Sequence, residues 1–424
     1  MLRTLLTAFS LMLWTCLTPI TCAQIDIAGL VQNFTLSDPA LLKVPPIVDN
    51  ETQTVIFPVY PGTSLSALAP VYSLTTGYTA SPHSGTTLDL SRPIDLCILY
   101  DGTEYQTWTL SAVNMRSPAL PGLYADPNIV VFGDTYYIYS TTDGFPGWGG
   151  NTLYVWSSRN LVDWTRTVDP VLTLNGTSGN VPWADGNAWA PTIHKRNGTY
   201  FLYFSGNNPT YDRKTIGVAT GPSPTGPFTA QSTAMILNNE ALNASQAIDP
   251  AAFVDPMTGT YYLFWGNGKP LMAELADDMT SLKQDTLANV VGLTNFTEAS
   301  FVVYRKPYYH YSFSNGNTND ASYYAGYATA TDVHGPWTYR GRVLEERSAK
   351  DILGTGSTST VNVPGTDDWF MAYHRFQIPS GNGTDREVCI DRIIFDQSDG
   401  LMWPVTPTLV GVAAESVPDG GHGW

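Results

Sequence analysis

The chain carries little charge for its length. Only 14% of its 424 residues are Asp, Glu, Lys or Arg, and 37 acidic residues outnumber 21 basic ones, which gives a formal net charge of -16 at pH 7. Scarce positive charge argues against binding to nucleic acid or to an anionic membrane surface. We therefore expect no nucleic-acid partner and no membrane partner, and the composition favours a neutral ligand.

Long apolar runs are almost absent. The one candidate runs from Leu5 to Leu17, follows Arg3 and precedes a small-x-small site at 21–23. This is the pattern of a cleaved secretory signal peptide, which we place at residues 1–23, with an uncleaved anchor as the alternative. No other stretch approaches the 18 apolar residues of a typical transmembrane helix, so we expect a secreted, extracellular protein.

Cysteine is scarce as well. Two of the four cysteines fall in the predicted signal peptide, which leaves Cys97 and Cys389 in strand-like stretches. They can pair in an oxidising compartment, but two separate thiols are favoured because a cysteine inside a strand is often a small core residue. Secretion also makes N-x-S/T sequons candidate glycosylation sites. The seven sequons begin at Asn33, Asn50, Asn175, Asn197, Asn243, Asn295 and Asn382.

Several common catalytic signatures are missing from the sequence. There is no G-x-S-x-G motif and no glycine-rich phosphate loop before a helix, and none of the six histidines has an H-x-x-x-H spacing. These absences argue against a serine hydrolase of the nucleophile-elbow type, a nucleotide-binding enzyme and a histidine-based metal centre. We expect no cofactor and no metal-binding residues.

What the sequence does contain is β-strand pattern throughout, without helical periodicity. Residues 24–117 hold short alternating strands such as Thr54–Tyr60 and Leu96–Tyr100, separated by P-G-T and D-G-T turn signals. This pattern predicts a small immunoglobulin-like β-sandwich as an accessory domain. A catalytic domain is predicted at 118–412, followed by a flexible tail at 413–424.

The second region repeats one pattern five times: a polar or small residue, a strand, a turn and an aromatic-rich strand. The period is roughly 50 to 65 residues, so five units of four strands would form a five-bladed β-propeller. A linear β-solenoid is the alternative, but it requires shorter and more regular repeats. The copies begin at Ala125, Trp189, Ile248, Thr297 and Gly354.

Three copies place an acid at the equivalent early position of the repeat, in one shared register: Asp126, Asp249 and Glu298. The innermost strand of each propeller blade lines the central channel, so equivalent positions in different blades converge. Clustered carboxylates push their pKa values apart, which provides one ionised base and one protonated acid. That combination cleaves a glycosidic bond.

The order of several motifs resembles glycoside hydrolase family 43. They are Y-A-D-P-N-I-V-V-F, W-A-P-T-I, A-I-D-P-A-A-F, G-P-W-T-Y-R-G and D-R-E-V-C-I-D-R. The resemblance implies a five-bladed propeller that acts on arabinose- and xylose-containing polymers with inversion at the anomeric carbon. It also implies that Asp126 is the general base, Asp249 the orienting and pKa-modulating acid, and Glu298 the general acid.

The same resemblance suggests substrate-binding residues. Trp189 is similar to a stacking tryptophan of the family, with a core tryptophan as the alternative, and Arg386 to an arginine that contacts the sugar. Phe145 and Trp148 lie in the glycine-rich loop G-F-P-G-W-G-G after the first hairpin of blade one, and this position makes them candidates for the wall of the sugar pocket. In the fifth repeat Ser357 stands where the family often has a histidine near a bound cation or water, so structural calcium on the axis is only an open alternative.

Weaker candidates complete the expected site. Asn151 and Tyr211 are possible pocket residues, and His374 is expected in the core rather than in the channel. We expect a monomeric, exo-acting α-L-arabinofuranosidase whose substrate is a plant cell-wall polysaccharide or oligosaccharide, with a β-xylosidase or an endo-arabinanase as alternatives. The rival from another class is a carbohydrate-binding propeller without catalysis, suggested by Ser357 and by the sequon at Asn295 close to Glu298.

Overall fold

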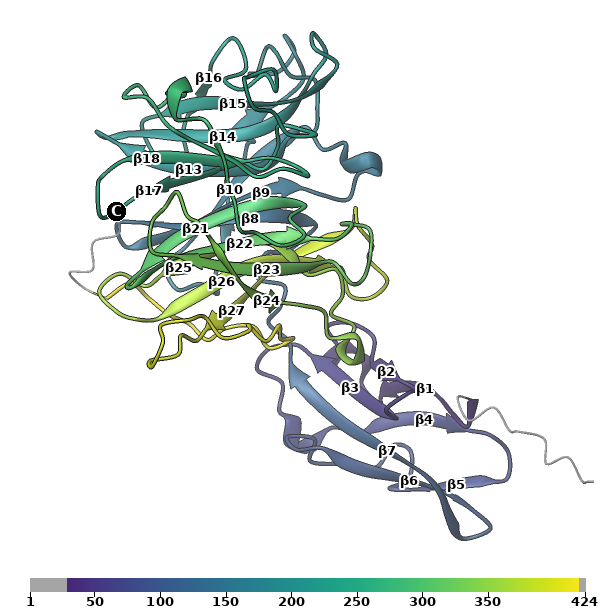
Figure 1. The fold of residues 1–424 in the computed structure, drawn as a ribbon. Helices are drawn as coiled ribbons and strands as arrows, with labels where there is room; N and C mark the ends of the chain where they lie inside the picture. The colour runs from purple at the N-terminus through teal and green to yellow at the C-terminus, as the bar shows by residue number, and fades with distance from the viewer. Residues whose placement is uncertain (1–28, 419–424) are drawn as a thin grey trace, which may run out of the picture.

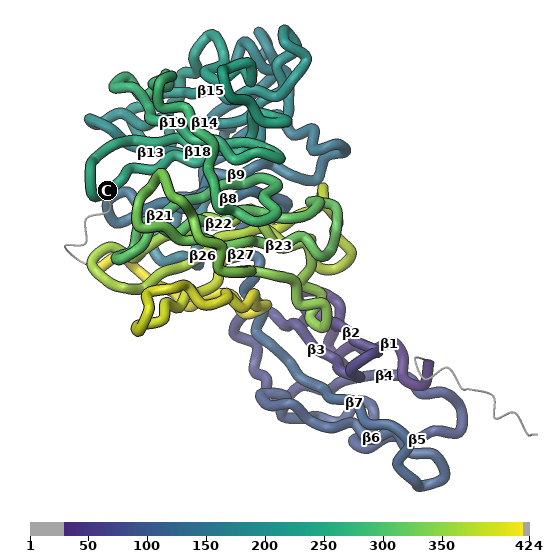
Figure 2. The backbone as a smooth tube through the Cα atoms, in the orientation of Figure 1, coloured from purple at the N-terminus to yellow at the C-terminus, as the bar shows by residue number. Residues whose placement is uncertain are grey.

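The computed structural model describes residues 29–418, which form an all-β structure with a few short 3-10 turns. Figures 1 and 2 show an N-terminal module beside a larger domain. No helix in this part of the chain has the length and apolarity needed to cross a membrane. The predicted signal peptide, with two of the four cysteines, lies outside the described residues, as does the end of the tail at 419–424.

The N-terminal module is a β-sandwich, as predicted. A five-stranded sheet in the order β2-β3-β7-β6-β5 faces a two-stranded sheet of β1 and β4, and Trp108 is buried in the core between them. The strands β3 and β7 run parallel and the other pairs are antiparallel. The strands are β1 (Val31–Leu36), β2 (Ile47–Asp49), β3 (Thr54–Val59), β4 (Pro70–Leu74), β5 (Tyr78–Ser81), β6 (Ile94–Tyr100) and β7 (Thr103–Asn114).

The second domain is the predicted five-bladed propeller. Blade one holds β8 (Tyr124–Phe132), β9 (Thr135–Thr142), β10 (Thr152–Ser158), β11 (Thr165–Arg166) and β12 (Leu172–Thr173). Blade two holds β13 (Trp189–Arg196), β14 (Thr199–Asn208), β15 (Arg213–Gly221) and β16 (Thr229–Ala230). Blade three holds β17 (Ala251–Val254), β18 (Tyr261–Trp265), β19 (Leu271–Glu274) and β20 (Ala288–Asn289). Blade four holds β21 (Glu298–Arg305), β22 (Tyr308–Asn315), β23 (Tyr324–Ala330) and β24 (Thr338–Leu344), and blade five holds β25 (Gly356–Asn362), β26 (Trp369–Phe376) and β27 (Arg386–Ile393).

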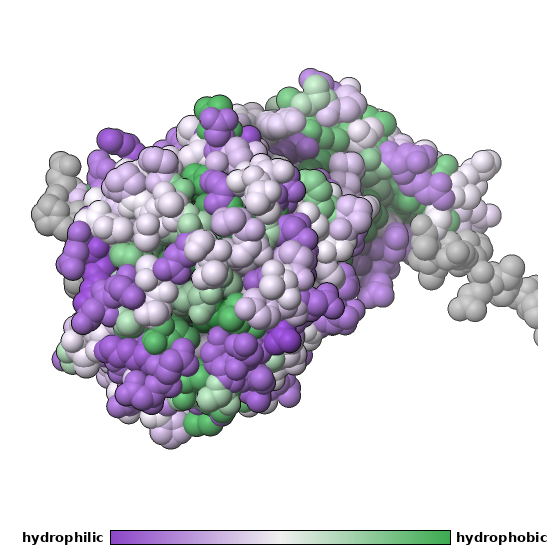
Figure 3. Space-filling model, turned by 90° about the horizontal axis from the view of Figure 1, so that it is seen from above, coloured by the Kyte–Doolittle hydropathy of each residue, from purple (hydrophilic) through white to green (hydrophobic). Residues whose placement is uncertain are grey.

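Apolar side chains fill the spaces between neighbouring blades. Five hydrophobic clusters join blade one to two, two to three, three to four, four to five, and five back to one. In the last cluster Ile129 and Ile138 of blade one pack with Val361 and Phe370 of blade five. This contact closes the ring and rules out a linear solenoid. Figure 3, which views the molecule from above, shows a surface of polar and neutral residues with several apolar areas between them.

Blade five departs from the expected four strands, because its sheet has only β25, β26 and β27. Extended chain covers part of the open edge of β27: Ala119 N–H donates to the Val388 carbonyl. Residues 413–418, expected to be part of a flexible tail, instead pack on the propeller. Glu415 N–H donates to the Asn160 carbonyl, and Val417 packs against the cluster that joins blades five and one.

The sandwich is anchored to the propeller through a mixed contact. Ile47 and Ile56 of the sandwich share an apolar cluster with Ile352 and Ile378 of the propeller. The Lys43 ammonium donates to the carbonyls of Arg116 and Ser117, which follow β7, at 3.2 and 3.1 Å. The two cysteines lie apart, Cys97 in β6 of the sandwich and Cys389 in β27, and both are free, which confirms the prediction of separate thiols.

Candidate active site

Each inner strand carries a distortion at the same place. At this position each blade has a non-glycine residue with a positive φ between 40° and 58°, and in four blades the pairing with the second strand shifts register there. Such a φ is uncommon for residues other than glycine and persists only where the surroundings impose it. The five residues are Asp126, Ala190, Asp249, Ala299 and Ser357.

These distortions show which residues are equivalent. Asp126 and Asp249 occupy the same station, as predicted, but the residue of blade four at that station is Ala299. Glu298 stands one residue earlier, where blade two has Trp189. The prediction that all three acids share one register is therefore wrong for Glu298. The one-residue offset points its side chain differently from those of the two aspartates.

The backbone N–H of each distorted residue is held by the preceding blade. In four blades it donates to a side chain of that blade's second strand. The acceptors are His374 for Asp126, Thr141 for Ala190, Ser205 for Asp249 and Ser314 for Ser357. These bonds tie neighbouring blades together at the channel mouth.

Blade four breaks this rule in a way that concerns the site. The matching position on the second strand of blade three is Gly266, which has no side chain to accept a hydrogen bond. Its φ is +124°, and an added Cβ would meet the Lys269 carbonyl oxygen. The Asp249 carboxylate takes over as acceptor of the Ala299 N–H, at 3.1 Å. Gly266 thus leaves room for Asp249 to be fixed beside the strand that carries Glu298.

Asp126 is surrounded by groups that stabilise its ionised form. Burial raises its pKa, but the positive charge of Arg386, 3.4 Å from Oδ1, and the hydrogen bond that Thr141 donates outweigh burial and hold the pKa well below the usual range. His374 is buried, as predicted, yet its Nδ1 lies 3.2 Å from the carboxylate. An ionised Asp126 suits a general base.

Asp143 supports this arrangement, although no pattern in the sequence points to it. The Arg386 Nε and Nη2 atoms donate to its two carboxylate oxygens at 2.8 and 3.2 Å, and the Arg386 N–H also donates to it. Such a two-pronged pair fixes the guanidinium plane toward Asp126. The residue follows β9 in a T-T-D-G turn, so no local pattern distinguishes it from an ordinary turn aspartate.

Asp249 and Glu298 show the opposite electrostatics. Burial raises the pKa of Asp249 well above its usual range, and the nearby charges of Glu298 and Asp126 raise it further. Burial also raises the pKa of Glu298, although hydrogen bonds from Tyr323 at 2.9 Å and Asn267 at 2.8 Å oppose the shift. The site therefore combines one strongly ionised carboxylate with two that hold protons more tightly.

One cavity brings these groups together. It has a volume of about 200 Å³. Trp189 forms part of its wall, with its indole N–H on the Trp148 carbonyl at 2.7 Å, and the Trp148 indole N–H binds the Gly383 carbonyl at 2.6 Å. The lining consists of Asp126, Trp148, Trp189, Gln246, Ile248, Asp249, Glu298, Ala299, Thr318, Tyr323 and Arg386.

Most of the predicted site residues meet in this cavity. Phe145, predicted as part of its wall, is not among the lining residues and is about 44% exposed. Asn151 and Tyr211, the weaker candidates, do not line it either. Gln246, Thr318 and Tyr323 were missed because they lie in loops outside the repeated segment, where the sequence carries no periodic signal.

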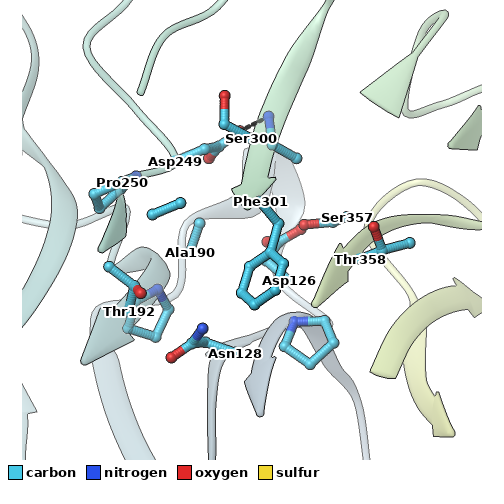
Figure 4. A pocket seen from close by; sticks show the side chains of 14 residues that line it. Asp126, Asn128, Ala190, Thr192, Asp249, Pro250, Ser300, Phe301, Ser357 and Thr358 are labelled. Carbon is cyan, nitrogen blue, oxygen red and sulfur yellow. Dashed lines mark hydrogen bonds between the residues drawn. The ribbon is translucent and has the colours of Figure 1, made fainter. Parts of the chain in front are cut away.

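A second, smaller cavity of about 30 Å³ lies next to the first on the propeller axis. Figure 4 shows residues from all five blades around it, including Ser357 and Thr358 of blade five. Its volume suits a water molecule. Two of its polar side chains are already engaged: Asn128 accepts the Ile193 N–H, and Thr358 donates to Ser312.

The lining includes only two carboxylates, Asp126 and Asp249, whereas a calcium ion takes six to eight oxygen ligands. Among residues 29–418 no group of three or more His, Cys, Asp or Glu side chains could hold a metal ion. Axial calcium stays a prediction that the arrangement of side chains does not favour.

A closed five-bladed propeller with acids of opposed pKa shifts around one cavity defines a carbohydrate-cleaving class of protein. Residues 115–402 match the family described as glycosyl hydrolases family 43, so the chain belongs to that family. Residues 26–112 match a separate family, described as SGBP, N-terminal.

Known relatives and structures agree with this assignment. The chain is 32% identical over 323 residues to the β-D-galactofuranosidase xynD of Aspergillus niger, which covers 73% of this chain and 90% of the relative. It is 29% identical to an arabinoxylan arabinofuranohydrolase of Bacillus subtilis, over 68% of this chain and 64% of the relative. A thermostable family-43 glycoside hydrolase of known crystal structure superimposes with a TM-score of 0.61, at 25% identity over 70% of this chain and 98% of that one.

Replacing Tyr323 with Phe tests the hydrogen bond on Glu298. That bond stabilises the carboxylate, so its loss should raise the Glu298 pKa further. If Glu298 must be protonated for activity, the alkaline limb of the kcat/KM profile should move to higher pH. Tyr311→Phe is the matched control, because the Tyr311 hydroxyl binds Ser300 and no carboxylate. An unchanged or lowered alkaline limb in Tyr323→Phe would contradict the prediction.

Proposed function

We propose that this protein is a secreted, exo-acting α-L-arabinofuranosidase that cleaves terminal arabinofuranosyl residues from plant cell-wall polysaccharides with inversion. The observation that carries the proposal is that Asp126 and Glu298 line one cavity and that their surroundings shift their pKa values in opposite directions. The family membership supports glycosidase chemistry. The N-terminal signal pattern supports secretion, as does the exposure of the asparagines of all seven sequons.

In the proposed mechanism, the ionised Asp126 carboxylate removes a proton from a water molecule as the water attacks the anomeric carbon. The protonated Glu298 carboxyl transfers its proton to the leaving oxygen of the glycosidic bond. Asp249 orients the strand that carries Glu298, because its carboxylate accepts the Ala299 N–H. A single displacement by water requires the base and the acid to be roughly 6.5 to 9.5 Å apart.

The size of the cavity supports exo action. At about 200 Å³ it is on the scale of one sugar unit rather than of an extended chain. Trp189 offers an apolar ring face, and Arg386 offers hydrogen-bond donors to sugar hydroxyls. A site for one terminal unit releases monosaccharides, whereas an endo-acting enzyme needs an open cleft.

A second candidate is a β-D-galactofuranosidase. It is favoured by the 32% identity to the Aspergillus niger protein of that name. Arabinofuranose and galactofuranose share a five-membered ring, and galactofuranose has one additional CHOH group in its exocyclic chain. The distinction therefore depends on space at one end of the cavity rather than on the catalytic acids.

Hydrolysis of 4-nitrophenyl glycosides tests the proposal. The α-L-arabinofuranoside should be cleaved with a kcat/KM at least about tenfold above those of the β-D-galactofuranoside and the β-D-xylopyranoside, which corresponds to about 1.4 kcal/mol of transition-state discrimination. The reverse order would favour the second candidate or a β-xylosidase. Release of oligosaccharides from arabinan would indicate endo action. Measurable sugar affinity without turnover of any substrate would favour a non-catalytic binding propeller.

A further inference from the structure

The outer edge of blade five contains a groove that the catalytic site does not use. Its volume is about 490 Å³, which lies within the usual range of ligand sites. Two large apolar side chains on it are half exposed, Ile394 at 54% and Trp403 at 53%. Large exposed apolar residues that adjoin each other commonly mark an interaction site. The residues that matter here are Arg392, Ile394, Trp403, Pro404, Thr406 and Glu415.

The groove exists because blade five lacks a fourth strand. In the other blades a strand completes the sheet on the outside, whereas β27 is followed by a turn and an irregular segment. Trp403 N–H donates to the Ile394 carbonyl, which sets the two side chains next to each other across this turn. The segment from Gly411 to Glu415 forms part of the opposite wall. The space of a missing strand is thus only partly filled.

The side chains of the groove suit a hydroxyl-rich ligand. The indole N–H of Trp403 donates to an Asp396 carboxylate oxygen at 3.2 Å, which holds the ring in place while the side chain stays half exposed. Apolar ring faces pack against the C–H faces of sugars, and polar groups at the margin bind hydroxyls. Arg392 supplies hydrogen-bond donors, Glu415 supplies acceptors, and the Thr406 hydroxyl can act as either. Charges of both signs disfavour a strongly charged ligand.

We propose that this groove is a second carbohydrate-binding site, which holds a segment of the polysaccharide whose terminal units are cleaved in the catalytic cavity. The choice of polysaccharide rests on the proposed function, but the existence of the site rests on the groove itself. The catalytic cavity holds about one sugar unit, so by itself it contributes little affinity for a polymer. A second binding site on the outer edge of blade five keeps the enzyme on the polymer between cleavage events. It thereby raises the effective concentration of chain ends at the catalytic cavity.

Trp403→Ala tests the proposal in the full chain. Binding to soluble arabinan and arabinoxylan is measured by affinity gel electrophoresis in the Glu298→Gln background, which prevents hydrolysis during the run. Removing the aromatic ring should weaken polymer binding about tenfold or more, because interfaces depend on a few anchored aromatic residues. Trp403→Phe, which keeps a flat ring, should retain most of the binding. With Glu298 intact, Trp403→Ala should leave kcat/KM on 4-nitrophenyl glycosides unchanged and raise KM on polymers several-fold.

The controls separate this site from the catalytic one. Tyr60→Ala removes an aromatic side chain of similar exposure outside the groove and should bind polymers like the parent. Failure to cleave any 4-nitrophenyl glycoside would refute the proposed function. The second site would still be judged by whether Trp403→Ala weakens polymer binding. Unchanged binding of Trp403→Ala to both polymers would overturn the second site. So would a change in oligomeric state by light scattering with unchanged polymer binding, because the groove would then be a contact between protein copies.

Discussion

Replacing Glu298 with Gln should lower kcat/KM on arabino-oligosaccharides by about 10² to 10⁴, because an alkoxide leaving group must be protonated as it departs. Gln has nearly the same shape and keeps the contacts to Tyr323 and Asn267, so folding should be preserved. Glycosides with an acidic leaving group, such as 2,4-dinitrophenol, need little protonation and should be cleaved at rates much closer to those of the parent. Steady-state kinetics on both substrates measure the loss of kcat/KM on the oligosaccharide and the loss on the activated glycoside, and the ratio of these losses is the test.

The pH dependence provides a second test of the same variant. Burial raises the Glu298 pKa, so the parent should lose activity as pH rises through that raised value. In Glu298→Gln this alkaline limb should disappear for the activated substrate, since no proton remains to be lost. Full retention of activity on oligosaccharides, or an unchanged alkaline limb, would remove Glu298 from the role of general acid.

Replacing Asp126 with Asn should be at least as damaging, with a loss of about 10² to 10⁴ that does not depend on the leaving group. The base acts on the attacking water, so a better leaving group cannot compensate for its absence. The guanidinium of Arg386 remains paired with Asp143, and the amide preserves the shape of the side chain, so the fold should survive. Kinetics on the same two substrate types distinguish this pattern from that of Glu298→Gln.

The stereochemistry of the parent enzyme checks the role of Asp126 directly. Proton NMR during the first minutes of hydrolysis should show the inverted anomer forming before mutarotation. Initial formation of the retained anomer would mean that a carboxylate attacks the sugar itself, and Asp126 would then not act through water. Substrate-dependent rescue of Asp126→Asn by a good leaving group would contradict its role as base in the same way.

The repeat was the strongest predictor of the fold. Five copies of strand, turn and aromatic strand indicated five blades, because each copy is an amphipathic unit that must bury its faces against neighbours. The strand count of blade five was wrong, since its fourth strand is replaced by irregular segments that carry no period-2 pattern. The local sequence pattern indicates which secondary structure a segment can form. It does not indicate which other part of the chain covers the open edge of a sheet.

The candidate site was predicted less evenly. Asp126, Asp249 and Glu298 were found because they recur near one place in the repeat, and all three line one cavity. Phe145 was placed in the cavity wall by its position in a glycine-rich loop, and the structure places it outside. Loop residues such as Tyr323 and Asn267, which hold Glu298, have no repeat to mark them.

The sequence by itself determined the β architecture, the number of blades and the identity of the three acids, because hydrophobic period and repeat length are local properties. Only the tertiary structure decided the register and the charge states. Glu298 lies one residue before the position that corresponds to the two aspartates. Because Gly266 has no side chain to accept a hydrogen bond, the Ala299 N–H donates to Asp249 instead. Asp143 fixes Arg386 beside Asp126 across 243 residues of sequence. The pKa of a buried acid depends on neighbours that are distant in sequence, and only closure of the ring brings them together.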